Sequence, residues 1–72
     1  MNYIRQFMRD NGLVPGQPFR ISDSRRLWFC FADDDRLDLC SEDAYMRSCL
    51  NFEYILLRLL RGETGVSTVM GS

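Results

Sequence analysis

The chain has 72 residues, a net charge of −1 and no histidine or lysine, so all nine of its basic residues are arginine. A domain of this size buries only about 60% of its unfolded surface, and such small cores are often supported by a disulfide, a metal or oligomerisation. The charge excludes general attraction to nucleic acid or anionic membranes, and the longest apolar run, interrupted by Glu53 and Arg58, is too short to span a bilayer.

The first predicted element is a short helix. Asn2 is suited to cap its N-terminus, and Asn11-Gly12 is a typical left-handed stop. Alternating apolar and polar residues then predict three strands, at 19–22, 27–31 and 37–40, which form an antiparallel meander. The inner face of this sheet is expected to carry Phe19, Ile21, Leu27, Phe29, Phe31, Leu37 and Leu39. The outer face is expected to carry Arg20, Ser22, Trp28, Cys30, Asp38 and Cys40.

Residues 44–61 are predicted to form one long helix that is capped by Ser41 and ends at Gly62. Its apolar side chains cover an arc of about 220°, which is wider than a surface helix usually shows. We therefore expect part of this surface to be covered by a second copy of the chain. The predicted interface comprises Glu53, Leu56, Leu57 and Leu60. Glu53 is expected either to pair across that interface or to lie at its rim in contact with water.

A short last strand is predicted within residues 65–70, at the edge of the sheet. Gly71-Ser72 resembles a cloning remnant. The predicted fold class is α+β, a single domain over residues 1–72. It comprises a short N-terminal helix, a three-stranded antiparallel meander, a long C-terminal helix packed on one sheet face through Phe29, and a weak terminal strand.

The residue inventory argues against catalysis and against a bound metal. Without histidine and lysine, the common general base and the usual partner of a nucleophilic serine or cysteine are missing. The three cysteines are odd in number, widely spaced and follow no signal peptide, which favours reduced thiols. The lack of a Cys-x-x-Cys pair and of histidine argues against a zinc site. The aspartates at 33–35 lack the spacing of a calcium loop. We expect no enzyme activity, no cofactor and no metal.

Two arginine-containing surfaces are candidates for recognition. On the outer face of the sheet, Arg20 and Trp28 are expected to meet across neighbouring strands, with Arg25 and Arg26 in the loop beside them. A ring with guanidinium groups suits a nucleotide or an acidic partner surface. In the alternative interpretation, Trp28 covers a small edge cluster or joins a subunit contact.

The second surface is a stripe on the polar side of the long helix. Its members follow one another at helical spacing, and they would engage a polyanion or simply form the solvated side of the helix. The stripe comprises Arg47, Tyr54, Arg58 and Arg61.

The chain also resembles a recurring type of small phage protein. The resemblance rests on Phe7, Asn11-Gly12-Leu13, Gly16, Phe19, Ile21, the hairpin at Phe31, Ile55-Leu56, Leu59-Leu60, Gly62-Glu63 and Val66. In this type, found in phages and prophages of Gram-positive bacteria, a leucine-rich helix is followed by a Leu-Leu-x-Gly-Glu turn.

The resemblance implies a non-catalytic binding protein in the cytoplasm of the bacterial host. Its expected role is to inhibit a component of antiviral defence by binding a protein or by sequestering a nucleotide second messenger. The alternative is a small transcriptional regulator that applies the arginine stripe to DNA or RNA.

Overall fold

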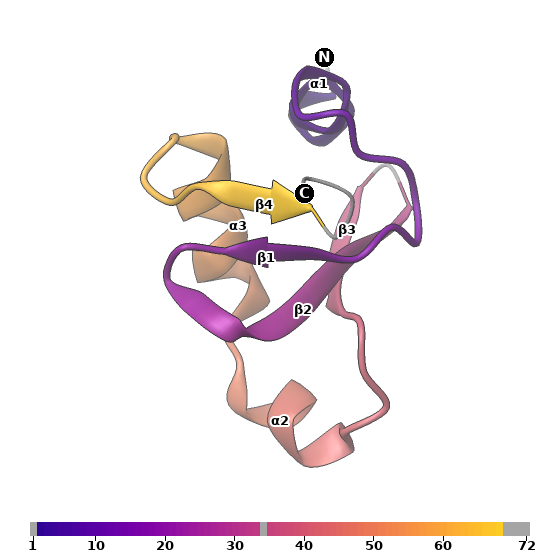
Figure 1. The fold of residues 1–72 in the computed structure, drawn as a ribbon, viewed down its shortest axis with the longest axis vertical. Coiled ribbons are helices and arrows are strands. Elements are labelled where there is room, and N and C mark those ends of the chain that lie inside the picture. Colours follow the sequence, from indigo (N-terminus) through magenta and orange to yellow (C-terminus); the bar gives the residue numbers. More distant parts are fainter. Residues whose placement is uncertain (1, 34, 69–72) are drawn as a thin grey trace.

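The computed structural model describes residues 2–33 and 35–68 and shows a small α+β domain (Figure 1). The four strands form one antiparallel sheet in the order β3-β2-β1-β4. The predicted meander is confirmed, and the terminal strand does join the sheet edge, beside β1. Residues 69 and 70 of the predicted strand lie outside the described residues. The elements are α1 (Tyr3–Asp10), β1 (Phe19–Ile21), β2 (Ser24–Asp33), β3 (Arg36–Leu39), α2 (Ala44–Cys49), α3 (Phe52–Leu60) and β4 (Val66–Thr68).

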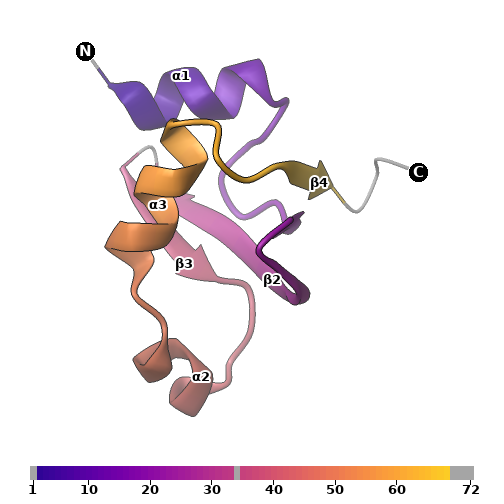
Figure 2. The ribbon, with the colours of Figure 1, turned by 90° about the vertical axis from the view of Figure 1, so that its left-hand side faces the viewer.

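Helix α1 begins and ends as its sequence predicts. The Asn2 side chain accepts a hydrogen bond from the Arg5 backbone N–H at 2.9 Å, which satisfies one of the donors left free in the first turn. Gly12 follows the helix with φ of 65°, a conformation in which a side chain would be strained. Met8 is buried, and α1 packs against α3 near one end of the molecule (Figure 2).

The inner face of the sheet forms the core. All of the apolar residues predicted for this face are buried except Leu27, which is partly buried. Phe19 stacks on Phe31 with ring centroids 5.5 Å apart, and Phe7 of α1 meets Phe31 edge-on at 6.1 Å. Aromatic pairs of this geometry each add about 0.5–1.5 kcal/mol beyond the burial of their area. The period-two pattern therefore identified the core correctly.

The single long helix predicted over residues 44–61 is wrong. Leu50 has an extended backbone with ψ of 140°, and the helical segment is divided into α2 and α3. The Asn51 side chain accepts a hydrogen bond from the Tyr54 N–H at 3.1 Å and so caps a new helix. Asparagine favours caps over helix interiors because its short polar side chain competes for backbone donors.

The two helices have different positions in the molecule. α3 lies against the sheet, where Phe52 meets Phe29 edge-on at 6.5 Å and Leu59 is buried. α2 lies at the end of the molecule opposite α1 (Figures 1 and 2) and has no buried residue. Its N-cap is Asp43, which accepts from the Met46 N–H at 3.0 Å, and not Ser41 as predicted. Packing on the Phe29 face is thus confirmed for the second half of the segment only.

An ion-pair network fixes the C-terminal end of α3 to the turn between β1 and β2. Arg58 of α3 pairs with Asp23 in that turn and with Glu63, whose Oε1 lies 3.2 Å from Arg58 Nη1. The Asp23 backbone N–H also donates to the hydroxyl of the buried Thr64 at 3.1 Å. Four groups from two distant segments are therefore held together beside the helix terminus.

This network predicts a loss of stability in acid. Hydrogen bonds from the Arg58 guanidinium hold the pKa of Asp23 below its ordinary value of 3.8. Because the folded-state pKa is the lower one, the stabilisation is complete well above pH 3.8 and is lost as the pH falls from there through the folded-state value. In urea titrations, wild type is expected to be more stable than Asp23→Asn at pH 7, and the difference should vanish at the acid end. A difference that does not change with pH would contradict this assignment.

Candidate functional site

A row of side chains crosses the outer face of the sheet. Arg20 of β1 is paired in register with Ser67 of β4, and on its other side its guanidinium carbon lies 4.0 Å from the centroid of the Trp28 ring on β2. The predicted meeting of Arg20 and Trp28 is confirmed. A guanidinium at this distance over an indole is attracted by the electrons of the ring. The stacking therefore limits the positions of an otherwise mobile, exposed arginine.

A shift in strand register brings Arg25 to the same face. Between the pairs Phe19↔Phe29 and Ile21↔Ser24, β1 advances by two residues and β2 by five, so β2 carries extra residues at this point. Arg25 and Arg26 are consequently part of β2, and their predicted position in a loop is wrong. Bulged residues of this kind often change the direction of a side chain beside a functional site.

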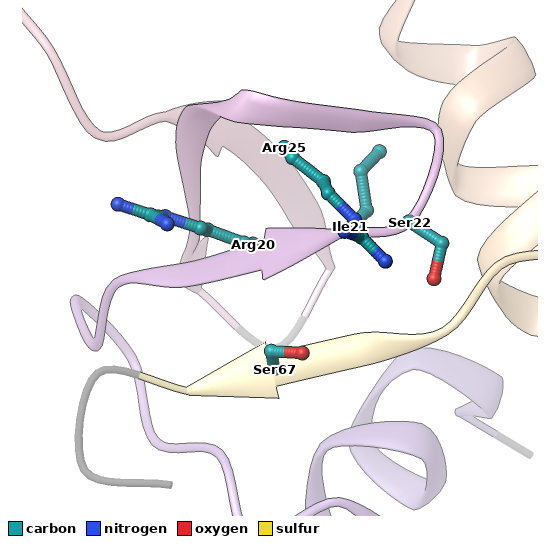
Figure 3. Close-up of a pocket in the computed structure, with 5 residues that line it drawn as sticks. All are labelled: Arg20, Ile21, Ser22, Arg25 and Ser67. Carbon is teal, nitrogen blue, oxygen red and sulfur yellow. The ribbon is translucent and has the colours of Figure 1, made fainter. Parts of the chain in front are cut away.

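The resulting surface contains a shallow depression of about 250 Å³. Figure 3 shows Arg25 reaching over β1 toward the hydroxyl-bearing Ser22 and Ser67, while Arg20 extends in the opposite direction. Arg26 is exposed but does not line the depression. We call this the Arg20–Arg25 surface, and it is lined by Arg20, Ile21, Ser22, Arg25 and Ser67.

The Arg20–Arg25 surface is positively charged and carries hydrogen-bond donors that could bind a ligand. Among the described residues, no carboxylate forms an ion pair with Arg20 or Arg25. The Ser22 Oγ accepts from the Gly65 N–H at 3.2 Å, which leaves its own O–H as a donor. No acidic side chain from the described part of the chain lines the depression. The Arg25 guanidinium and the hydroxyls of Ser22 and Ser67, with Arg20 at the edge, therefore offer donors to an anionic oxygen group.

The arginines predicted to form one stripe do not share a helix. Arg47 lies on α2, where its Nε donates to Asp38 Oδ1 at 3.0 Å and its Nη2 donates to the carbonyls of Leu39 and Ser41. Arg58 is occupied by Asp23 and Glu63 and lies 6.0 Å from the ring centroid of Tyr54. The prediction of a continuous polyanion-binding stripe therefore lacks its geometric basis, and only Arg61 remains exposed and outside these ion pairs.

The residues predicted for an oligomer interface lie on α3 but face different ways. Glu53 is exposed in the first turn, a favourable place for a carboxylate near the positive end of the helix. Leu56 and Leu60 are partly buried against the core, whereas Leu57 is 49% exposed. The apolar surface left uncovered on this helix is smaller than the sequence predicted.

Cys30 and Cys40 are neighbours on the sheet, and Cys49 is exposed on α2. Cys30 and Cys40 both lie on the outer face of the sheet, and the Cys40 N–H donates to the Trp28 carbonyl at 2.7 Å. Burial raises the pKa of the Cys30 thiol, and the neighbouring Cys40 raises it further. A thiol with a raised pKa is a weak nucleophile at neutral pH, which favours a packing role.

Within residues 2–33 and 35–68, no three acidic or cysteine side chains gather closely enough to share a metal ion. None of the helices described there has the length and apolar character of a bilayer-spanning segment.

Comparison with known proteins adds no relative. No protein-family model matches the chain, and neither the curated proteins nor the solved structures contain a match. Of the predicted surface, Arg20 and Arg25 line the depression, whereas Arg26 does not. The sequence did not indicate Ser67, because its position depends on how β4 pairs with β1.

Proposed function

We propose that this chain is a non-catalytic binding protein that recognises a phosphate-bearing ligand at the Arg20–Arg25 surface. The observation that carries the proposal is a depression lined by two arginines, to which no acidic side chain of residues 2–33 and 35–68 is ion-paired. Arginine suits phosphate because its planar group presents several N–H donors that match the phosphate oxygens. The hydroxyls of Ser22 and Ser67 add uncharged donors.

The size of the depression limits what it holds. At about 250 Å³ it is smaller than the roughly 300–1,000 Å³ of pockets that enclose a whole small molecule. The anionic group would occupy the depression, and the remainder of the ligand would lie over the neighbouring sheet surface. Because Arg20 already covers one face of the Trp28 ring, recognition would depend on the charged group more than on stacking of a base.

The resemblance to small phage proteins supplies the biological part of the proposal. In that setting, the chain would inhibit a component of host antiviral defence by sequestering a nucleotide second messenger in the cytoplasm of the bacterial host. A protein surface bearing a phosphate or a carboxylate cluster would meet the same side chains. The nucleotide and the protein surface would both present anionic oxygen atoms to the arginines, and they would differ in how much of the sheet surface they contact.

The test uses Trp28, the single tryptophan, as the reporter. Titration with cyclic dinucleotides should change Trp28 fluorescence, since a ligand that draws Arg20 away alters the environment of the ring. Arg25→Ala should weaken binding about tenfold or more, because hydrogen bonds to charged groups contribute roughly 1.5–3 kcal/mol. Arg36→Ala, which removes an exposed arginine outside the depression, is the matched control and should bind normally.

Three results would oppose the proposal. Equal affinity of Arg25→Ala and wild type would remove the ligand from this surface. Absence of binding by any nucleotide or by inorganic phosphate would remove the small-molecule form of the proposal. Binding to duplex or single-stranded nucleic acid that falls steeply with salt would favour the regulator instead.

A further inference from the structure

The outward side of α3 carries a short stripe with opposite charges at its two ends. Glu53 and Leu57 lie in α3 and Arg61 is its C-cap, which keeps a helical backbone. The three follow one another at intervals of four residues, so each lies about 40° around the helix axis from the one before it. Leu59, which is buried, lies on the opposite side of the helix. Glu53 and Arg61 are exposed, and neither forms an ion pair with any of the described residues.

This stripe is complementary to itself. Leu57 lies midway between Glu53 and Arg61. A two-fold axis through Leu57 would therefore place Glu53 of each chain opposite Arg61 of the other and form two charge pairs. Two-fold interfaces have this property, in that each contact occurs in both directions. A parallel arrangement would instead oppose like charges. The charge order therefore specifies an antiparallel arrangement of two α3 helices.

We propose that two copies of this chain associate through antiparallel α3 helices, with Leu57 at the two-fold axis. The partner is a second copy because the same three residues supply both halves of each charge pair. Leu57 is 49% exposed in the isolated chain and Tyr54 is 58% exposed, and both would lose contact with water on association. This proposal is independent of the Arg20–Arg25 surface, which lies on other elements.

The contact is expected to be weak and reversible. A helix of nine residues is only about 14 Å long, and stable interfaces usually bury about 1,200–2,000 Å² in total. A hollow of about 200 Å³ between α1 and α3, lined in part by Tyr3, Phe7 and Leu60, extends the surface beside the helix. The assembly would thus be sensitive to protein concentration and to salt.

The test exchanges the charges. Glu53→Arg and Arg61→Glu should each weaken self-association about tenfold, measured by sedimentation over a wide range of concentrations, because each places like charges opposite one another. The double variant with both changes should recover association. An equal mixture of the two single variants should also form a heterodimer, since every charge pair is again opposite in sign. Glu42→Arg, an exposed change outside the helix, is the control and should associate as wild type does.

The outcomes of this experiment distinguish lost self-association from lost folding and test the antiparallel arrangement. Circular dichroism of the single variants distinguishes lost association from lost folding, and the mixture does so independently because unfolded chains would not pair. A wild-type chain that stays monomeric at high concentration would overturn the proposal. Failure of both the double variant and the mixture to associate, with folding intact, would overturn the antiparallel arrangement. Failure of the Arg20–Arg25 surface to bind a ligand would not change the expected self-association of wild type or of the charge variants.

Discussion

Replacement of Phe29 by alanine is expected to remove most of the free energy of unfolding at 25 °C. Phe29 is 0% exposed and lies between two other aromatic rings, 6.3 Å from Phe19 and 6.5 Å from Phe52. Truncation of a buried phenylalanine costs about 3–5 kcal/mol, because transfer energy is lost and a cavity remains. Native domains have only about 5–15 kcal/mol of stability, and a chain of 72 residues belongs near the lower end.

Urea unfolding followed by circular dichroism and Trp28 fluorescence measures this effect. Phe29→Leu retains much of the volume and should lose less stability. Arg26→Ala, on the same strand but exposed, should change the free energy of unfolding by no more than about 0.5 kcal/mol. A loss of less than about 1 kcal/mol in Phe29→Ala would mean that the three rings do not form the centre of the core.

The strands were predictable because one side of the sheet is buried. Alternation with a period of two residues placed Phe19, Phe29 and Leu39 on a single face. A shift of register by one residue would move these side chains to the exposed face, so the pattern strongly limits how the strands pair. The same alternation placed Arg20 and Trp28 together on the outer face, and the structure confirms their contact. Cross-strand neighbours follow directly once register is known.

The helical segment was predicted less well because apolar spacing outweighed a local signal. The apolar residues continue at helical spacing on both sides of the polar Asn51. In the structure, however, α2 ends at its C-cap Leu50 and Asn51 caps the start of α3. A capping residue contributes about 1 kcal/mol, which is comparable to what a continuous helix would gain at one position. The break also removed the arginine stripe, whose alignment required an uninterrupted helix.

The remainder of the site depended on irregular pairing. Nothing in the sequence shows that β2 gains extra residues opposite Ile21, and it is this shift that brings Arg25 onto the sheet face. Ser67 joins the site only because β4 lies beside β1, a contact between segments more than forty residues apart. Period and propensity describe neighbours within an element, whereas bulges and edge pairings are decided by how distant elements fit together.

Two leucines on α3 should respond in opposite ways to the same change. Leu59→Ala is expected to reduce the free energy of unfolding by about 2–5 kcal/mol, because Leu59 is 1% exposed and packs in the core. Leu57→Ala should leave the unfolding of the single chain within about 0.5 kcal/mol of wild type, since Leu57 is 49% exposed. Self-association should show the reverse preference, with Leu57→Ala weakening it strongly.

The comparison needs two measurements on each variant, urea unfolding at low concentration and sedimentation at high concentration. Tyr45→Ala, which removes a 74% exposed aromatic side chain from α2, is the control and should change neither result. Large destabilisation by Leu57→Ala at low concentration would place that leucine in the core and remove the outward face of α3. A leucine on the two-fold axis occurs twice in the interface, so its replacement removes two side chains from the contact. Self-association of Leu57→Ala equal to that of wild type would therefore mean that any contact between copies lies elsewhere than on the outward side of α3.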